Sequence, residues 1–262
     1  MKISDLGKDM IQPSRRPRYN RPPRIDKKSI LAIGDSQIPF HDHEWINKCK
    51  KLAFAYGIRT SLWAGDIVDF TSLSIFVAKN QEVEKELIEC EEHLGELAAG
   101  FTDIIYLPGN HELRLQRLLR EWVSMDRVCK LLNLPKQVRG FDYSFCEVGG
   151  DWLVEHPKNY SVIAGRVAAT LAEKYRKNIA IFHDHQCGEM KTRDGRFIGM
   201  SVGMCADGSR LDYYSVAHST TPKMMQGALL LRWDGQQYFP HHLTEETDWD
   251  YEFFCARKKG KK

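Results

Sequence analysis

The chain has 262 residues, of which 42% are hydrophobic and 28% are charged, a composition typical of a globular protein with room for one large core. No apolar stretch approaches the roughly 18 residues of a membrane-spanning helix, and the N-terminus lacks the pattern of a signal peptide. The seven cysteines are irregularly spaced and form no CxxC pair, which argues against a disulfide framework or a thiolate zinc site. We therefore expect a cytoplasmic protein that does not associate with a membrane.

Both ends of the chain are basic. Residues 1–28 contain nine Lys or Arg against three Asp, a net charge of +6, and residues 257–262 add +5, which leaves −8 between them from a total of +3. The N-terminal segment is rich in proline and poor in apolar residues, so we expect an extended arm over 1–28. A single domain over 29–250 and a basic tail over 251–262 should follow. The arm could contact nucleic acid phosphates, or it could be only a solvated tail.

Short apolar runs alternate with helical patterns along the predicted domain. Apolar residues at intervals of three and four predict helices over 45–56, 87–98, 112–123 and 161–175. Strand, loop and helix in repetition are typical of a layered α/β fold. After about residue 195 the runs 196–203, 227–233 and 236–243 predict antiparallel strands, with a turn in WDGQ between the last two.

Five apolar runs end on residues that can bind a metal. These junctions are 30–33 before Asp35 and Gln37, 62–64 before Asp66, 104–107 before Asn110 and His111, 152–154 before His156, and 179–182 before His183 and His185. Ligands of open α/β sheets bind beyond the carboxyl ends of the strands, so we expect these side chains to meet in one place. Together they supply about the number of oxygen and imidazole ligands that two adjacent divalent cations require.

The same blocks, in this order, resemble the signature of the calcineurin-like metallophosphoesterases. They read GDSQ at 34–37, GDIVD at 65–69, GNHE at 109–112, EHP at 155–157 and FHDH at 182–185. The resemblance covers about residues 29–243. It implies a layered α/β fold, a β-sandwich flanked by helices, with the active site at the C-terminal ends of the strands.

The resemblance also implies two metal sites that share one carboxylate. One site would be formed by Asp35, Gln37, Asp66 and His185, and the other by Asp66, Asn110, His156 and His183. Gln37 replaces the usual histidine, and its neutral amide oxygen should suit manganese or magnesium better than zinc or iron. We expect two divalent cations, Mn²⁺ first, with Mg²⁺, Fe²⁺ and Zn²⁺ as alternatives. Phe182 replaces the usual glycine but removes no ligand.

Four further residues receive possible roles beside the metals. The resemblance makes His111 the group that stabilises the transition state or protonates the leaving oxygen, and Asp69 the group that orients it. Asp69 could instead cap the following segment. Arg114 could contact a substrate phosphate or lie on the polar face of its helix. His41 could reach the mouth of the site, or could be an exposed histidine near a helix start that Asp42 caps.

The implied activity is hydrolysis of a phosphate ester by a metal-bridging hydroxide, without a phosphoenzyme. The substrate could be a phosphodiester of nucleic acid or nucleotide, or a phosphomonoester, and nucleic acid could be a partner through the basic ends. A metal-free or weakly metallated protein-binding scaffold on the same fold is the alternative. A nucleic-acid-binding module that acts through its arms would leave the metal ligands unexplained. The sequence indicates no oligomeric state.

Overall fold

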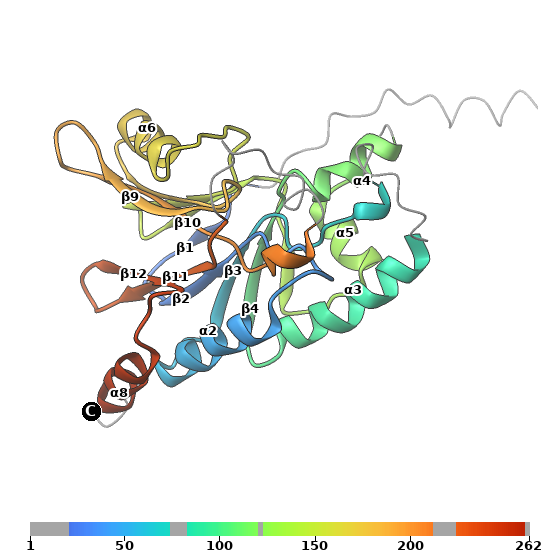
Figure 1. The fold of residues 1–262 in the computed structure, drawn as a ribbon, viewed down its shortest axis with the longest axis horizontal. Helices are drawn as coiled ribbons and strands as arrows, with labels where there is room; N and C mark the ends of the chain where they lie inside the picture. Colours follow the sequence, from blue (N-terminus) through green and yellow to red (C-terminus); the bar gives the residue numbers. More distant parts are fainter. Residues whose placement is uncertain (1–20, 74–82, 120–122, 212–223, 260–262) are drawn as a thin grey trace, which may run out of the picture.

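Two six-stranded β-sheets pack face to face in the computed structural model, with helices on both outer sides (Figure 1). The structure describes residues 21–73, 83–119, 123–211 and 224–259. Within these residues, no helix combines the length and the apolar character needed to cross a membrane. The arrangement confirms the predicted layered α/β fold, a β-sandwich flanked by helices.

The first sheet carries three of the five predicted junctions. Its strands, in spatial order, are β12 (Tyr238–Thr244), β11 (Gly227–Trp233), β2 (Ile30–Ile33), β3 (Thr60–Ala64), β4 (Asp103–Leu107) and β5 (Val138–Gly140). Strands β2 to β5 are parallel, whereas β11 runs antiparallel to both β2 and β12. The carboxyl ends of β2, β3 and β4 therefore lie side by side at one edge.

The second sheet carries the other two junctions. Its strands, in spatial order, are β1 (Arg24–Ile25), β6 (Phe145–Val148), β7 (Trp152–Glu155), β8 (Asn178–Ile181), β10 (Ile198–Val202) and β9 (Cys187–Lys191). Strand β8 is parallel to both β7 and β10. The ends of β7 and β8 thus meet the ends of β2, β3 and β4 across the sandwich.

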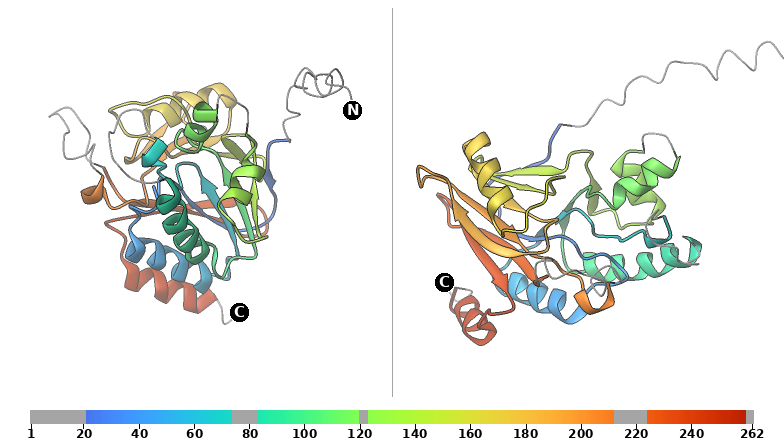
Figure 2. Two further views of the ribbon diagram at one scale, coloured as in Figure 1. Left: turned by 90° about the vertical axis from the view of Figure 1, so that its right-hand side faces the viewer. Right: turned by 45° about the horizontal axis from the view of Figure 1, so that its top comes forward.

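Alternation along the strands explains the layers. In β3, Leu62 and Ala64 face the core between the sheets, while Trp63 faces a second core beneath the outer helices. The outer side of the first sheet is covered by α2 (His43–Ala55), α3 (Val83–Ala98) and α5 (Met125–Leu131), and the outer side of the second by α6 (Arg166–Tyr175) (Figure 2). Strands buried on both faces become continuous apolar runs, which is why the sequence shows them clearly.

The first residues of helices α2 and α6 differ from the predicted ones. Helix α2 begins at His43 because the Asp42 carboxylate accepts a hydrogen bond of 2.9 Å from the Trp45 N–H. Helix α6 begins at Arg166 rather than at residue 161, after Gly165 in the left-handed region at φ 75°. Helix α4 (Glu112–Leu119) lies in the segment predicted as helical over 112–123, of which 120–122 fall outside the described residues.

Both predicted basic ends overlap ordered elements. Within the arm predicted over 1–28, β1 pairs with β6 and Ile25 is buried in the core between the sheets. Residues 1–20 lie outside the described residues. Within the tail predicted over 251–262, helix α8 (Trp249–Lys259) packs on α2 through Trp249, whose ring centroid lies 5.4 Å from that of Trp45. The distribution of charge along the sequence therefore does not predict where β1 and α8 begin or end.

Candidate metal centre

The strand ends bring the seven predicted ligand residues into two adjacent groups. The first group contains Asp35, whose carboxylate Oδ1 lies 3.1 Å from Nε2 of His185. The side-chain Nε2 of Gln37 lies 3.3 Å from the same His185 nitrogen. Asp35 and Gln37 are fully buried. One carboxylate, one amide and one imidazole therefore converge after β2 and β8.

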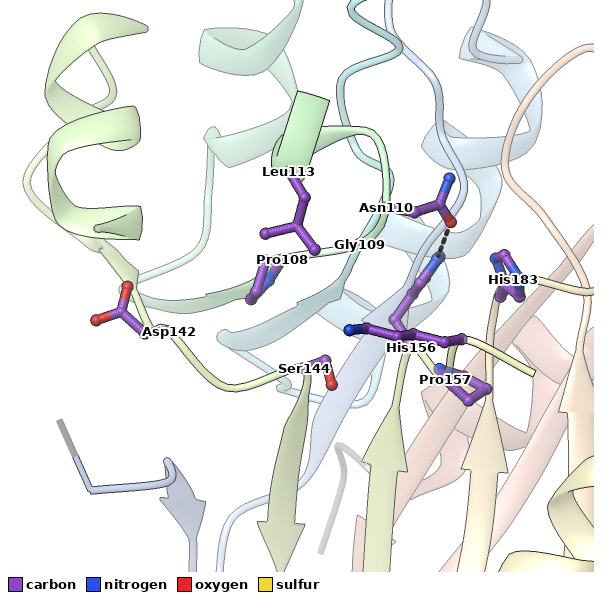
Figure 3. A pocket seen from close by; sticks show the side chains of 10 residues that line it. Pro108, Gly109, Asn110, Leu113, Asp142, Ser144, His156, Pro157 and His183 are labelled. Carbon is purple, nitrogen blue, oxygen red and sulfur yellow. Dashed lines mark hydrogen bonds between the residues drawn. The ribbon is translucent and has the colours of Figure 1, made fainter. Parts of the chain in front are cut away.

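The second group forms around Asp66, and Figure 3 draws its members Asn110, His156 and His183. His156 Nε2 lies 3.3 Å from the Asp66 Oδ2 and 3.3 Å from the Asn110 Oδ1. Ligand atoms of Asp66, His156 and His183 all lie within 4.8 Å of one another, so a single cation could contact all three. The His156 Nδ1 lies 3.1 Å from the Ala64 carbonyl oxygen, which fixes the ring and leaves Nε2 toward the group.

His183 connects the two groups. Its backbone N–H donates a hydrogen bond of 2.7 Å to the Asp35 Oδ2, while its ring lies 4.9 Å from the His156 ring, centroid to centroid. The backbone N–H of Gln37 donates to the Asp66 carbonyl oxygen at 3.0 Å. The donors of both groups are oxygen and imidazole nitrogen, the set that divalent first-row cations accept. The chemistry of these residues therefore fits the expected cations.

In the second group, the negative charge of Asp66 is offset by protonation of the neighbouring histidines. Burial alone would raise the pKa of Asp66, but the imidazoles of His156 and His111 hold it below its usual range. Burial would likewise lower the pKa of His156, but the carboxylates of Asp66 and Asp35 raise it to about 9. The pKa of His183 is lowered by burial and by the neighbouring His156. A cation that binds here would displace the proton of His156, because only the neutral ring is a ligand.

Most of the ligand residues have unusual backbone conformations. Five of the seven lie in the left-handed region, with φ of 47° at Asp35, 47° at Gln37, 49° at Asp66, 98° at His183 and 54° at His185. The turns also need one glycine for space: a Cβ at Gly109 would lie 2.1 Å from the Asp66 Oδ1. Close contact between the loops after β3 and β4 thus positions Asp66 and Asn110.

His111 lies beside the second group but faces other partners. Its Nδ1 is 2.9 Å from the Asp69 Oδ1, and its Nε2 is 3.6 Å from the Asp66 Oδ2. Arg114 places Nη2 2.8 Å from the His111 Nε2 and donates from Nη1 to the Asp69 carbonyl oxygen at 2.6 Å. Burial opposes protonation of His111, yet Asp66 and Asp69 raise its pKa. Three of the four residues predicted to act beside the metals, His111, Asp69 and Arg114, therefore form one contact cluster.

Glu112, which is not among the predicted site residues, organises the loops around this centre. It is 1% exposed and accepts hydrogen bonds from the backbone N–H groups of Asp66 at 2.9 Å, Ile67 at 2.9 Å and Gly109 at 2.7 Å. The Tyr106 hydroxyl donates a further bond of 2.7 Å. Its place in the GNHE block was the available signal. Which loops its carboxylate would join depends on the tertiary fold.

A cavity of about 440 Å³ adjoins the second group (Figure 3). Asn110, His156 and His183 line one part of it. The remaining wall is formed by Pro108, Gly109, Leu113, Asp142, Ser144, Pro157 and Lys158. His41, predicted at the mouth of the site, is not among these residues; it lines a separate small cavity with His43 and His93. Lys158, which the sequence analysis did not single out, is the cationic residue of the larger cavity wall.

One family profile matches most of the chain. The profile of a family described as calcineurin-like phosphoesterase matches residues 28–219. A comparison with curated protein sequences finds no match. Similar solved structures include the phosphoesterase Yfce from E. coli, with 11% identity, a TM-score of 0.38, and coverage of 82% of this chain and 98% of that chain. Vacuolar Protein Sorting 29 from Cryptosporidium parvum shows 12% identity, a TM-score of 0.38, and coverage of 83% and 98%.

Proposed function

This chain belongs to the calcineurin-like phosphoesterase family, and we propose that it is a dinuclear metal-dependent hydrolase of phosphate esters. The observation that carries the proposal is the convergence of Asp66, His156 and His183 within 4.8 Å of one another, next to the group around Asp35. A structural role alone would not require so many buried polar ligand groups in strained turns. The ester would be a phosphodiester of nucleic acid or nucleotide, or a phosphomonoester.

Two cations would be held by the two groups described above. Asp35, Gln37 and His185 would bind one, and Asn110, His156 and His183 the other, with Asp66 shared between them. The Gln37 amide oxygen favours Mn²⁺ or Mg²⁺ over Zn²⁺ at the first position, and rotation of the amide would turn this oxygen toward the cation. When bound, the two cations would lower the pKa of a coordinated water and offset the charge of the phosphate.

His111 is proposed to supply a proton to the leaving oxygen. The Asp69 carboxylate beside Nδ1 orients the ring and, with Asp66, raises the pKa of His111, the direction that the role of proton donor requires. The contact of 2.8 Å between the Arg114 Nη2 and the His111 Nε2 requires an unprotonated Nε2. A substrate phosphate that attracts the Arg114 guanidinium would break this contact and allow Nε2 to carry the proton.

The organic part of the ester would occupy the cavity beside the second group. Lys158 would attract the anionic substrate, and Leu113 and Pro108 offer apolar surface. Asp142 and Ser144, which also line the cavity, offer hydrogen-bonding groups. The Asp142 Oδ1 already accepts a hydrogen bond of 2.8 Å from the Met125 N–H, which holds this carboxylate in place. A polar group held in place in the cavity wall suits selection among esters.

The test is a panel of esters with metal-stripped and manganese-loaded protein. The panel contains an aryl monoester, an aryl diester, single-stranded DNA, cyclic nucleotides and phosphopeptides. We expect hydrolysis of at least one class with manganese and none after chelation. Equal inactivity of both preparations on the whole panel would contradict the proposal and favour the protein-binding scaffold.

A further inference from the structure

A second group of potential ligands lies outside the catalytic centre. His41 precedes α2, His43 is the first residue of α2, and His93 and Glu96 lie on α3 at a spacing of three residues. All four line one small cavity, which shares no lining residue with the cavity beside Asp66. The proposed phosphoesterase mechanism uses none of them.

Glu96 lies between two of the imidazoles. Its Oε2 is 3.7 Å from the His43 Nδ1 and 3.8 Å from the His93 Nδ1. Zinc binds nitrogen and carboxylate oxygen at about 2.0 to 2.2 Å, so two ligand atoms of a tetrahedral site lie about 3.4 Å apart. Each of these two separations is within a few tenths of an ångström of that in a bound site. No three of the four residues, however, bring one ligand atom each within 4.8 Å of one another, so the exposed His43 and Glu96 side chains would have to rotate toward a bound ion.

The ring positions match a bound site for one pair of imidazoles and exceed it by about 1 Å for the other. The ring centroid of His41 lies 4.7 Å from that of His93 and 6.2 Å from that of His43. Two imidazoles on one tetrahedral zinc place their centroids about 5 Å apart, because each centroid lies about 3.2 Å from the metal. The interplanar angles of 60° and 63° exclude parallel stacking, so these rings do not pair through their faces.

His41 contributes an independent observation. Its side chain is buried, at 9% exposure, and its Nδ1 has no hydrogen-bond partner among the described residues. A buried ring nitrogen without a partner carries a desolvation cost that a ligand would remove. The cavity that His41 lines measures about 20 Å³, the size of one ion or water molecule rather than of an organic ligand.

We propose that His41, His43, His93 and Glu96 bind a single transition-metal cation of the zinc class. Three imidazoles with one carboxylate suit Zn²⁺ better than Mg²⁺ or Mn²⁺, so this site differs in preference from the catalytic centre. Lys50, which donates to the Glu96 carbonyl oxygen at 2.5 Å, is a cation in the same cavity wall and lowers the affinity. The bound ion would tie the start of α2 to α3.

The test counts zinc in the full-length protein. We expect wild-type protein equilibrated with near-stoichiometric zinc to retain one equivalent more than the double variant His43→Ala, His93→Ala. Both substituted residues lie at the surface, with side chains 58% and 34% exposed, so the double variant should fold. The second variant, Glu96→Gln, keeps the shape of the side chain and should lower zinc affinity by about tenfold or more.

His241→Ala is the matched control. The His241 Nε2 lies 3.0 Å from the Glu252 Oε1, a histidine and glutamate contact without further imidazole ligands, so its loss should leave the zinc content unchanged. In Co²⁺-loaded protein, the visible absorption of the tetrahedral site should disappear in the double variant and remain in the control. Manganese-dependent ester hydrolysis should be unchanged in every variant.

Two results would overturn the inference. Equal zinc content in wild type and double variant would show that these residues bind no metal, and equal losses in the double variant and in His241→Ala would show binding to scattered histidines. The site does not depend on the proposed hydrolase activity. If no ester is hydrolysed but the extra zinc equivalent is lost on substitution, the proposed function fails and this site stands.

Discussion

His111 and His156 are both buried histidines beside Asp66, but their surroundings differ. His156 directs Nε2 toward Asp66 and Asn110, whereas His111 is held by Asp69 and Arg114. His156→Ala should therefore lower metal content and turnover together, with partial recovery in excess manganese. His111→Ala should keep both metals and reduce turnover by about a hundredfold or more, less for esters with good leaving groups.

Elemental analysis beside steady-state kinetics separates these two outcomes. Loss of metal in His111→Ala, or full occupancy in His156→Ala, would contradict the division into proton donor and ligand. Gln37→His serves as a complementary variant, since an imidazole at this position should tighten zinc binding at the first site.

Glu112 offers a test of how the loops are held. Glu112→Gln replaces an acceptor oxygen by an amide nitrogen, so at least one buried N–H of Asp66, Ile67 or Gly109 loses its partner. We expect a loss of about 2 to 4 kcal/mol in the free energy of unfolding and weaker metal binding. Tyr106→Phe removes one donor and leaves the carboxylate in place, so its cost should be about 1 kcal/mol. Urea unfolding of both variants measures the difference, and equal costs would contradict this role of Glu112.

The sequence predicts the metal ligands, but it does not predict the residues that hold or surround them. Asp35, Asp66 and His183 follow apolar runs that are visible along the chain, and the signature blocks fix their order. The contacts of Glu112 and Lys158 depend on loops that meet only after the sheets have packed. No periodicity records such contacts, because they join segments far apart in sequence.

At the scale of elements, helix α6 packs closely on strand β10. A Cβ at Gly199 would lie 2.1 Å from the backbone nitrogen of Ala169, so Gly199→Ala should push α6 outward and cost about 1 to 3 kcal/mol. Gly95 on α3 is the control, because its Cβ would meet nothing within 4 Å. Gly95→Ala should stabilise the protein by about 0.5 to 1 kcal/mol. Thermal melts that show the same sign for both would contradict this packing.

The two sheets are also joined by a histidine on β12. The His242 Nε2 donates a hydrogen bond of 2.8 Å to the Val202 carbonyl oxygen of β10, and burial lowers the pKa of His242. Below the unfolded pKa of about 6.5 the unfolded chain binds more protons, so this residue reduces stability as pH falls. His242→Gln can keep the donor without titrating. Its melting temperature should fall less than that of wild type between about pH 7 and pH 5, and parallel curves would contradict this.

The long periodic elements were predictable, and the short ones were not. Strands β2, β3 and β4 appear as apolar runs because both of their faces are buried. Strands β1 and β5 have two and three residues, too few to show alternation. Helix α8 ends in a run of basic residues, so its charge concealed the aromatic contact of Trp249 with α2.

At the scale of the whole molecule, the basic N-terminal segment includes one strand of the fold, β1. Residues 1–20 hold five Lys or Arg against two Asp, whereas Ile25 belongs to the core between the sheets. Deleting 1–20 should weaken binding to single-stranded DNA and flatten its salt dependence, because five basic residues are removed, while hydrolysis of a small ester is nearly unchanged. Deleting 1–28 removes β1 and should also lower the melting temperature. Equal melting temperatures for the two deletions would contradict a structural role of β1.

The left-handed backbone at Asp35, Gln37, Asp66, His183 and His185 bears on how this protein can change under selection. Each such conformation costs an ordinary residue about 1 kcal/mol, a cost that glycine does not carry and asparagine carries only in part. In a mutant library screened for survival of heat alone, glycine and asparagine should accumulate at these five positions. In a library screened for ester hydrolysis the original side chains should persist. Selection for thermal stability and selection for activity would therefore favour different residues at the same five positions.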